Sequence, residues 1–180
     1  WDTSSVYENW DNNDLRKQYI WYSWNTPLGN ILLSKKFADR VDPQAANDYP
    51  WYRYADLLLI YAEASCVAAG GPTADGVEKL NMVHRRAYGY DPLQPSPVDF
   101  QLADYDEQSF ADLVVKERGY ETQIEGKRWL DLKRTGKVKE YILAARGIVV
   151  ADKHLLWPIP ASELATNKAL DPSKDQNPGY

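Results

Sequence analysis

The sequence predicts a mainly α-helical protein, made of TPR-like antiparallel helix pairs with long loops and one small β-hairpin. Two observations favour this fold class. Apolar residues recur at three- and four-residue steps in several segments, which is typical of helices with one buried face. Glycine and proline clusters separate these segments by short turns, and helices joined by short turns lie antiparallel. No 34-residue repeat is visible, although paired antiparallel helices are the unit of a TPR-like array.

The first helix pair is the best defined. Pro50 precedes a helix over 53–69, whose shared face we expect to hold Tyr54, Leu57, Leu58, Tyr61, Ser65 and Ala68. Gly70-Gly71-Pro72 ends this helix. Thr73 is the expected N-cap of a second helix, which ends at Gly89.

Later segments continue the helical pattern after a proline-rich loop over 90–105. Asp106 or Ser109 opens a third helix with a stripe reaching Ile124, and two more helices are expected over 126–135 and 137–146. Beyond Gly147 we expect either a short strand pair or a strapped loop, then one helical turn at 162–164.

The beginning of the chain has a different character. Residues 1–16 are polar and are expected to be irregular. Residues 19–24 favour a strand because they are rich in aromatic side chains, and 31–34 favour a second. The loop between them predicts a hairpin, followed by a polar connection over 35–48.

Composition excludes several classes of function. A net charge of −5 and a pI near 5.1 favour neither nucleic acid nor an anionic membrane surface as a partner. Cys66 is the single cysteine, so no intrachain disulfide can form. His84 and His154 lack the spacing of a metal site, and no phosphate-binding loop or nucleophile motif is present. We therefore expect no metal and no cofactor.

Charged residues in the helices have two interpretations, a structural ion network or a catalytic acid/base pair. Glu63 lies among small residues and is expected to form a clamp with Arg85 or Arg86 of the second helix. Glu117 and Glu121 have the spacing of an acid/base pair, but nearby arginines should lower the pKa of both carboxyls, which a glycosidase acid cannot tolerate. We expect instead a structural ion network and no enzyme. Its members are Arg53, Glu63, Arg85, Glu117, Arg118, Glu121, Arg128, Asp131 and Arg134.

Five segments of the chain form a recognisable series. They are Arg53-Tyr54-Ala55-Asp56-Leu57-Leu58-Leu59-Ile60-Tyr61-Ala62-Glu63-Ala64, Asn81 with Val83-His84-Arg85-Arg86-Ala87-Tyr88-Gly89, Glu117-Arg118-Gly119-Tyr120-Glu121, Glu125 to Arg134, and Trp157-Pro158-Ile159-Pro160 with Gln176-Asn177-Pro178-Gly179-Tyr180. In this order, they resemble the SusD/RagB family of outer-membrane nutrient-binding proteins. The resemblance implies a TPR-related fold, of which residues 1–180 would be a single C-terminal region of a longer protein.

The resemblance also implies a place and partners. Family members are lipid-anchored at the outer face of the outer membrane through an N-terminal cysteine, here expected in sequence outside this chain. They sit on a SusC-like TonB-dependent transporter and bind oligo- or polysaccharide.

Seven Trp and 13 Tyr against three Phe suit a sugar-binding protein, because these rings combine a flat apolar face with a polar tip. The glycan-binding candidates are Trp21, Tyr22 and Trp24. Two alternatives remain open: the rings pack against other parts of the polypeptide, or the region contacts the transporter without binding sugar. A glycoside hydrolase is the third, disfavoured reading.

Overall fold

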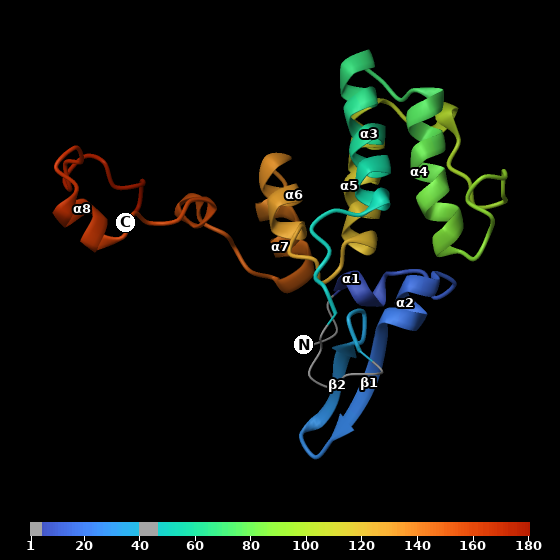
Figure 1. Cartoon of the computed structure of the whole chain (residues 1–180), viewed down its shortest axis with the longest axis horizontal. Coiled ribbons are helices and arrows are strands. Elements are labelled where there is room, and N and C mark those ends of the chain that lie inside the picture. Colours follow the sequence, from blue (N-terminus) through green and yellow to red (C-terminus); the bar gives the residue numbers. More distant parts are fainter. Residues whose placement is uncertain (1–4, 40–46) are drawn as a thin grey trace. The chain divides into compact units, whose positions relative to one another are not determined.

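The computed structural model describes residues 5–39 and 47–180, and it confirms the mainly helical fold class with one small hairpin (Figure 1). The chain divides into two compact units, Trp1–Asp131 and Leu132–Tyr180. The expected connection over 35–48 lies partly outside the described residues.

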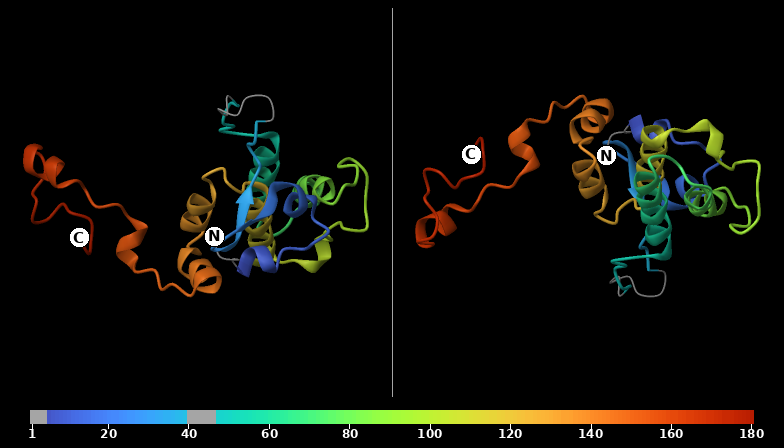
Figure 2. Two further views of the ribbon diagram at one scale, coloured as in Figure 1. Left: turned by 90° about the horizontal axis from the view of Figure 1, so that it is seen from below. Right: turned by 90° about the horizontal axis from the view of Figure 1, so that it is seen from above.

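The first unit is built on three helices: α3 (Tyr54–Ala69), α4 (Ala74–Ala87) and α5 (Glu107–Glu121). The α3–α4 pair is confirmed, with Gly70 left-handed at the end of α3 and Thr73 accepting the Gly76 amide as N-cap of α4. Figures 1 and 2 show α4 and α5 beside α3. Apolar side chains of all three helices form the core, including Leu59, Leu80, Phe110 and Val114.

The buried face of α3 is not the one predicted. Tyr54, Leu57, Tyr61 and Ala68 are exposed, whereas the core contains Ala55, Leu58, Leu59, Ala62 and Cys66. The physical reason is that α3 is apolar on two sides, so that periodicity alone does not select the side that packs.

The start of α5 settles one alternative, because Asp106 is the N-cap and exchanges reciprocal hydrogen bonds with Ser109. The helix ends at Glu121, three residues before the predicted Ile124, which has a φ of 65°. A 3₁₀ turn over Leu102–Asp104 precedes α5.

Two short helices near the start of the chain were not predicted. Residues 1–16 were expected to be irregular, but they include a short helix α1 (Ser5–Glu8) and the start of α2 (Leu15–Ile20). Asp14 caps α2 by accepting the Arg16 amide at 2.9 Å. The predicted strands are present as β1 (Trp21–Thr26) and β2 (Gly29–Ser34), with a tighter turn than expected.

The second unit holds the end of α6 (Arg128–Arg134), α7 (Val138–Arg146), a 3₁₀ turn over Asp152–Leu155 and α8 (Ala161–Thr166). After Gly147 the chain forms the expected loop and not a strand pair. Its tail is fixed by side chains: Gln176 exchanges two hydrogen bonds with the Ile159 backbone, and Asn177 donates to the Trp157 carbonyl at 2.6 Å. The Tyr180 hydroxyl lies within 3.1 Å of the Lys153 and Leu156 carbonyls.

Candidate functional site

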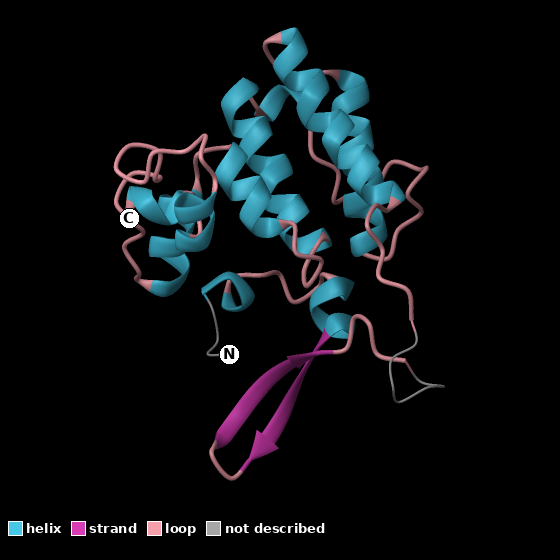
Figure 3. Cartoon of the chain, turned by 60° about the vertical axis from the view of Figure 1, so that its left-hand side comes forward, coloured by secondary structure: helices cyan, strands magenta, loops and turns pink. Residues whose placement is uncertain are grey.

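The β-hairpin carries the sugar-binding candidates, and its register divides them between two faces. Trp24 pairs with Ile31 and Tyr22 with Leu33, so these four side chains share one face, while Trp21 lies on the other. Tyr22 is 44% exposed and Trp24 58%, whereas Trp21 is only 9% exposed. Figure 3 shows the hairpin extending from the helices of its unit.

Trp21 is a packing residue in this arrangement. Its ring meets Tyr7 edge-on, with centroids 6.2 Å apart, and its indole nitrogen is buried. Tyr22 and Trp24 are two positions apart in β1, so their Cα atoms lie about 6.5–7 Å apart along the strand on the same face. The structure therefore brings together two of the three candidates as an exposed platform.

A second group of exposed aromatic residues lies just before and at the start of α3. The sequence did not lead us to predict it as a candidate for sugar binding. Trp51 is 79% exposed and Tyr52 81% exposed. The Lys127 ammonium lies 5.7 Å from the centre of the Tyr52 ring. The aromatic doublet directly after Pro50 was the available signal.

A buried charge network anchors the hairpin on its N-terminal side. In α2, Arg16 lies 2.6 Å from Asp14, 2.7 Å from Glu117 and 3.2 Å from Glu121. Its guanidinium is 9% exposed, and the three carboxylates are almost fully buried. The segment leading into β1 is thus held against α5 by charge-assisted contacts.

Lys36, which follows β2, anchors the other side. Its ammonium lies 2.5 Å from Glu125 and donates to the Glu121 and Gln123 carbonyls at 2.8 and 3.0 Å. The pKa of Lys36 is lowered from its ordinary value, because burial and the nearby Arg53 together outweigh the carboxylates of Glu125 and Glu121. Both ends of the hairpin are therefore tied to the C-terminal end of α5.

Further pairs connect these anchors to the other helices. Arg53 lies 2.8 Å from Glu121 and 2.7 Å from Glu125, and Arg86 lies 2.6 Å from Glu121. Lys127 lies 2.6 Å from Asp56. Lys127 also lies 3.2 Å from Glu125, which joins these pairs into one network. Among the described residues, its members include Asp14, Asp56, Glu117, Glu121, Glu125 and Asp131 with Arg16, Lys36, Arg53, Arg86, Arg118 and Lys127.

Several residues of the predicted network lie in the observed one. Five predicted members belong to it: Arg53, Glu117, Arg118, Glu121 and Asp131. Lys36 and Asp56 were missed, because their partners are 89 and 71 residues away in sequence.

The clamp expected between Glu63 and the arginines of α4 is replaced by other contacts. Arg85 lies 2.7 Å from Glu78 and 2.6 Å from Asp99, and its hydrogen bonds lower the pKa of Asp99 to about 2. Arg86 forms an ion pair with Glu121. Arg85 therefore closes the proline-rich loop onto α4. Arg128 donates to the Val115 carbonyl at 2.8 Å, and Arg134 lies in the second unit.

The electrostatics of Glu117 and Glu121 oppose general acid catalysis. Burial raises the pKa of Glu117, but Arg16 and His84 outweigh it and the pKa is about 2. Burial likewise raises the pKa of Glu121, and Arg86, Arg16 and Arg53 bring it below its ordinary value. A glycosidase requires one carboxyl that keeps its proton near neutral pH, and these two are ionised there.

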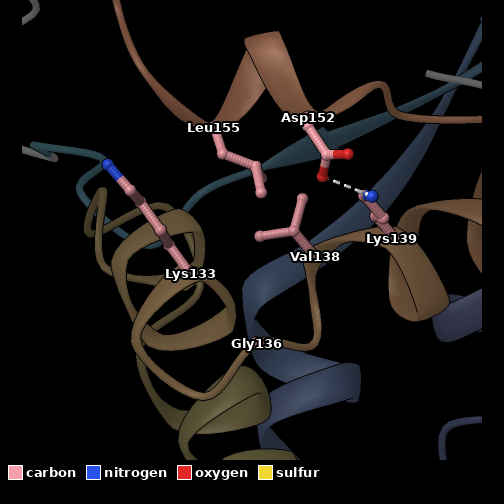
Figure 4. A pocket seen from close by; sticks show the side chains of 6 residues that line it. All are labelled: Lys133, Gly136, Val138, Lys139, Asp152 and Leu155. Carbon is pink, nitrogen blue, oxygen red and sulfur yellow. Dashed lines mark ion pairs between the residues drawn. The ribbon is translucent and has the colours of Figure 1, made fainter. Parts of the chain in front are cut away.

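Two small pockets lie elsewhere on the described residues. One of about 240 Å³ in the second unit is lined by Lys133, Gly136, Val138, Lys139, Asp152 and Leu155 (Figure 4). Lys139 and Asp152 form an exposed ion pair there. The other, about 230 Å³, lies beside α4 and α5, where Trp10 stacks on Tyr120 with centroids 4.6 Å apart. Trp10 is 2% exposed, so its ring is already covered.

Within residues 5–39 and 47–180, no helix is both long and apolar enough to cross a bilayer. In the same part of the chain, no three His, Cys, Asp or Glu side chains come together as a metal site.

Comparison with known proteins identifies the family. The SusD family profile matches residues 30–180. The chain belongs to the SusD family. SusD-like protein P2 of Formosa agariphila is 30% identical over 143 residues, which are 76% of this chain and 27% of that protein. SusD-like protein P38 of the same organism is 28% identical over 172 residues, covering 91% of this chain and 33% of that protein.

Solved structures of the SusD superfamily have the same fold. A SusD homolog from Bacteroides thetaiotaomicron has a TM-score of 0.64 and 27% identity, covering 93% of this chain and 41% of that one. Surface glycan-binding protein A from Bacteroides uniformis has a TM-score of 0.69 and 23% identity, covering 96% and 39%. The chain thus spans about a third of its curated SusD-like relatives.

Proposed function

We propose that this chain is part of a non-catalytic glycan-binding component of an outer-membrane, TonB-dependent uptake system. The observation that carries the proposal is the exposed Tyr22–Trp24 platform on a hairpin that charge pairs fix at both ends. Flat aromatic faces suit the apolar faces of pyranose rings, and a fixed platform loses little entropy when a ligand binds.

Two further observations support this function. One structural relative is described as a surface glycan-binding protein. The ionised state of Glu117, whose pKa is about 2, favours binding over hydrolysis. The SusC-like transporter as partner, and the outer face of the outer membrane as location, are inferred from membership of the SusD family.

The platform residues precede the stretch that the family profile matches, which begins at residue 30. We therefore expect Tyr22 and Trp24 to influence which glycan is bound, while the matched helices supply the common scaffold.

A second candidate function is contact with the transporter without sugar binding. Leu28 at the hairpin tip is 98% exposed, and Ile31 and Leu33 lie on the same face as the two rings. An apolar surface of this kind also suits a protein partner.

The proposal is tested with the native-length polypeptide, by which we mean the whole natural protein that contains this chain. Its binding to a panel of glycans is measured by affinity electrophoresis and calorimetry. We expect binding that Trp24→Ala weakens about tenfold, a typical loss for one stacked ring. Trp157→Ala is the matched control, because Trp157 is 85% exposed and lies in the other unit. Absence of binding to every glycan, with transporter binding retained, would favour the second function. Hydrolysis that Glu117→Gln abolishes would contradict both.

A further inference from the structure

The hairpin that carries the Tyr22–Trp24 platform has no charged side chain. Residues 21–34, which form β1, the turn and β2, contain no Asp, Glu, Lys or Arg. Exposed strands with free edges usually carry lysine or other charges, which keep them from pairing with other chains. A ligand on this hairpin is therefore bound without any charge that the hairpin supplies.

The two lysines that follow β2 do not bring a cation to Trp24. The Lys36 ammonium forms an ion pair with Glu125 in the charge network. The Lys35 amide donates to the Ile20 carbonyl, so Lys35 lies at the base of the hairpin, roughly 13 Å along the strand from Trp24. The hairpin extends from the helices of its unit (Figure 3), and the chain has a formal net charge of −5. An anionic ligand at Trp24 would therefore meet no compensating charge on the hairpin and a net repulsion from the chain.

The polar side chains of the hairpin lie away from the platform. Alternation along the strands puts Ser23, Asn25 and Asn30 on the opposite face. On the platform face, the Thr26 hydroxyl is used within the turn, where it donates to the Gly29 carbonyl at 2.7 Å. The platform therefore holds a sugar mainly by contact with its rings and reads the arrangement of the sugar hydroxyls only weakly.

The two rings are spaced for more than one sugar residue. The Cα atoms of Tyr22 and Trp24 lie about 6.5–7 Å apart along β1, with both side chains on one face. A monosaccharide that stacks on one ring leaves the other ring unoccupied, whereas a chain that runs along β1 contacts both. The second contact is then made within one complex, which raises the affinity for a chain above that for its single residues.

We propose that the platform takes an uncharged glycan chain of two or more residues, laid along β1, and rejects glycans that carry carboxylate or sulfate groups. This inference rests on the proposed function, because it names the class of glycan that the same platform binds. The rejection follows from the cost of covering an anion on an apolar surface without a paired cation.

The test compares glycans that differ in charge and little else. Each neutral glycan that binds in the panel is converted to carboxymethyl and hydroxyethyl derivatives with the same degree of substitution, which are similar in size. Each acidic glycan that binds is compared with its carboxyl-reduced or desulfated form. Dissociation constants for the native-length polypeptide are measured by calorimetry, and the constituent monosaccharides are measured beside each chain.

We expect the uncharged member of each pair to bind at least about tenfold more tightly than the charged member. Its affinity should change less than about twofold when the ionic strength rises from roughly 0.05 to 0.5 M, because no ion pair is screened. Each chain should bind at least about tenfold more tightly than its monosaccharide. Tyr22→Ala and Trp24→Ala should each weaken binding of the chain. Ser23→Ala is the matched control, since Ser23 lies between the two rings in sequence but on the other face.

The possible failures are distinguishable. A charged glycan that binds as tightly as its uncharged partner, and loses affinity in Trp24→Ala, would overturn the inference and leave the proposed function standing. A monosaccharide that binds as tightly as its chain would do the same. Absence of binding to every glycan would contradict the proposed function and the inference together. So would binding that neither Tyr22→Ala nor Trp24→Ala weakens.

Discussion

Glu121 occupies the middle of the charge network, and its neutralisation is the sharpest test of that network. The carboxylate is 4% exposed and lies 3.2 Å from Arg16, 2.8 Å from Arg53 and 2.6 Å from Arg86. Glu121→Gln keeps the size of the side chain and removes one negative charge. Three guanidinium groups then share an uncharged amide.

The three partners do not contribute equally. Arg16 is 9% exposed, so most of its lost attraction cannot be replaced by water, whereas Arg86 is 49% exposed and is largely solvated. Removing one partner of a buried pair costs about 3–5 kcal/mol. Because Arg16 keeps Asp14 and Glu117, we expect a loss near the lower end, about 3 kcal/mol in the free energy of unfolding.

Urea denaturation followed by circular dichroism measures this loss as a shift of the midpoint at constant slope. Lys79→Gln is the control, since Lys79 forms an exposed pair with Asp75 within α4, at 3.2 Å. Its expected cost is below about 0.5 kcal/mol. If Glu121→Gln costs no more than Lys79→Gln, the network does not anchor the hairpin as described.

Three further predictions concern acid stability and the α3–α4 turn. Glu117 has a pKa of about 2 in the folded chain against an ordinary 4.5, so its contribution of roughly 3 kcal/mol is present above pH 4.5 and is lost as pH falls toward 2. Urea titrations from pH 6 to 2 should show this decline, and a flat profile would contradict it. Thr73→Ala removes the acceptor of the Gly76 amide and should cost about 1 kcal/mol, with Thr73→Ser nearly neutral; equal losses in both variants would argue against a capping role. Gly76→Ala puts a Cβ 2.4 Å from the Ser65 hydroxyl oxygen and should cost about 1–3 kcal/mol. Ser65→Ala should recover part of that loss, and a double variant no more stable than Gly76→Ala would refute the clash.

Much of the helical scaffold could be predicted because its signals are local. Thr73 and Gly70 mark the turn between α3 and α4, and Asp106 marks the start of α5. The two partners of such a cap lie within about four residues of each other, so a short stretch of sequence contains both of them. The hairpin was predictable for the same reason, through its aromatic strands and intervening turn.

Other features depend on contacts between distant residues. The buried side of α3 could not be predicted, because the helix is apolar on both sides and the choice depends on α4 and α5. Lys36 lies in a polar connection, and its role depends on Glu125, 89 residues later. Helix α2 has six residues and is stabilised mainly by Arg16 reaching α5, not by propensity.

The candidate site was predicted only in part for a related reason. Trp21, Tyr22 and Trp24 look alike in sequence, but alternation along β1 puts Trp21 on the opposite face. Which face is buried depends on packing against Tyr7. The sequence could therefore name three rings, and only the fold shows that two of them are exposed on one face.

The most direct test of the proposed function is ¹⁹F NMR of the native-length polypeptide labelled with 5-fluorotryptophan. Trp24→Phe assigns the Trp24 resonance. Trp21→Phe assigns a buried control, and Trp157→Phe assigns an exposed control in the other unit. Titration with a glycan that binds in the panel should shift the Trp24 resonance and leave those of Trp21 and Trp157 in place. A binding glycan that leaves the Trp24 resonance unmoved would contradict the hairpin platform as the glycan site.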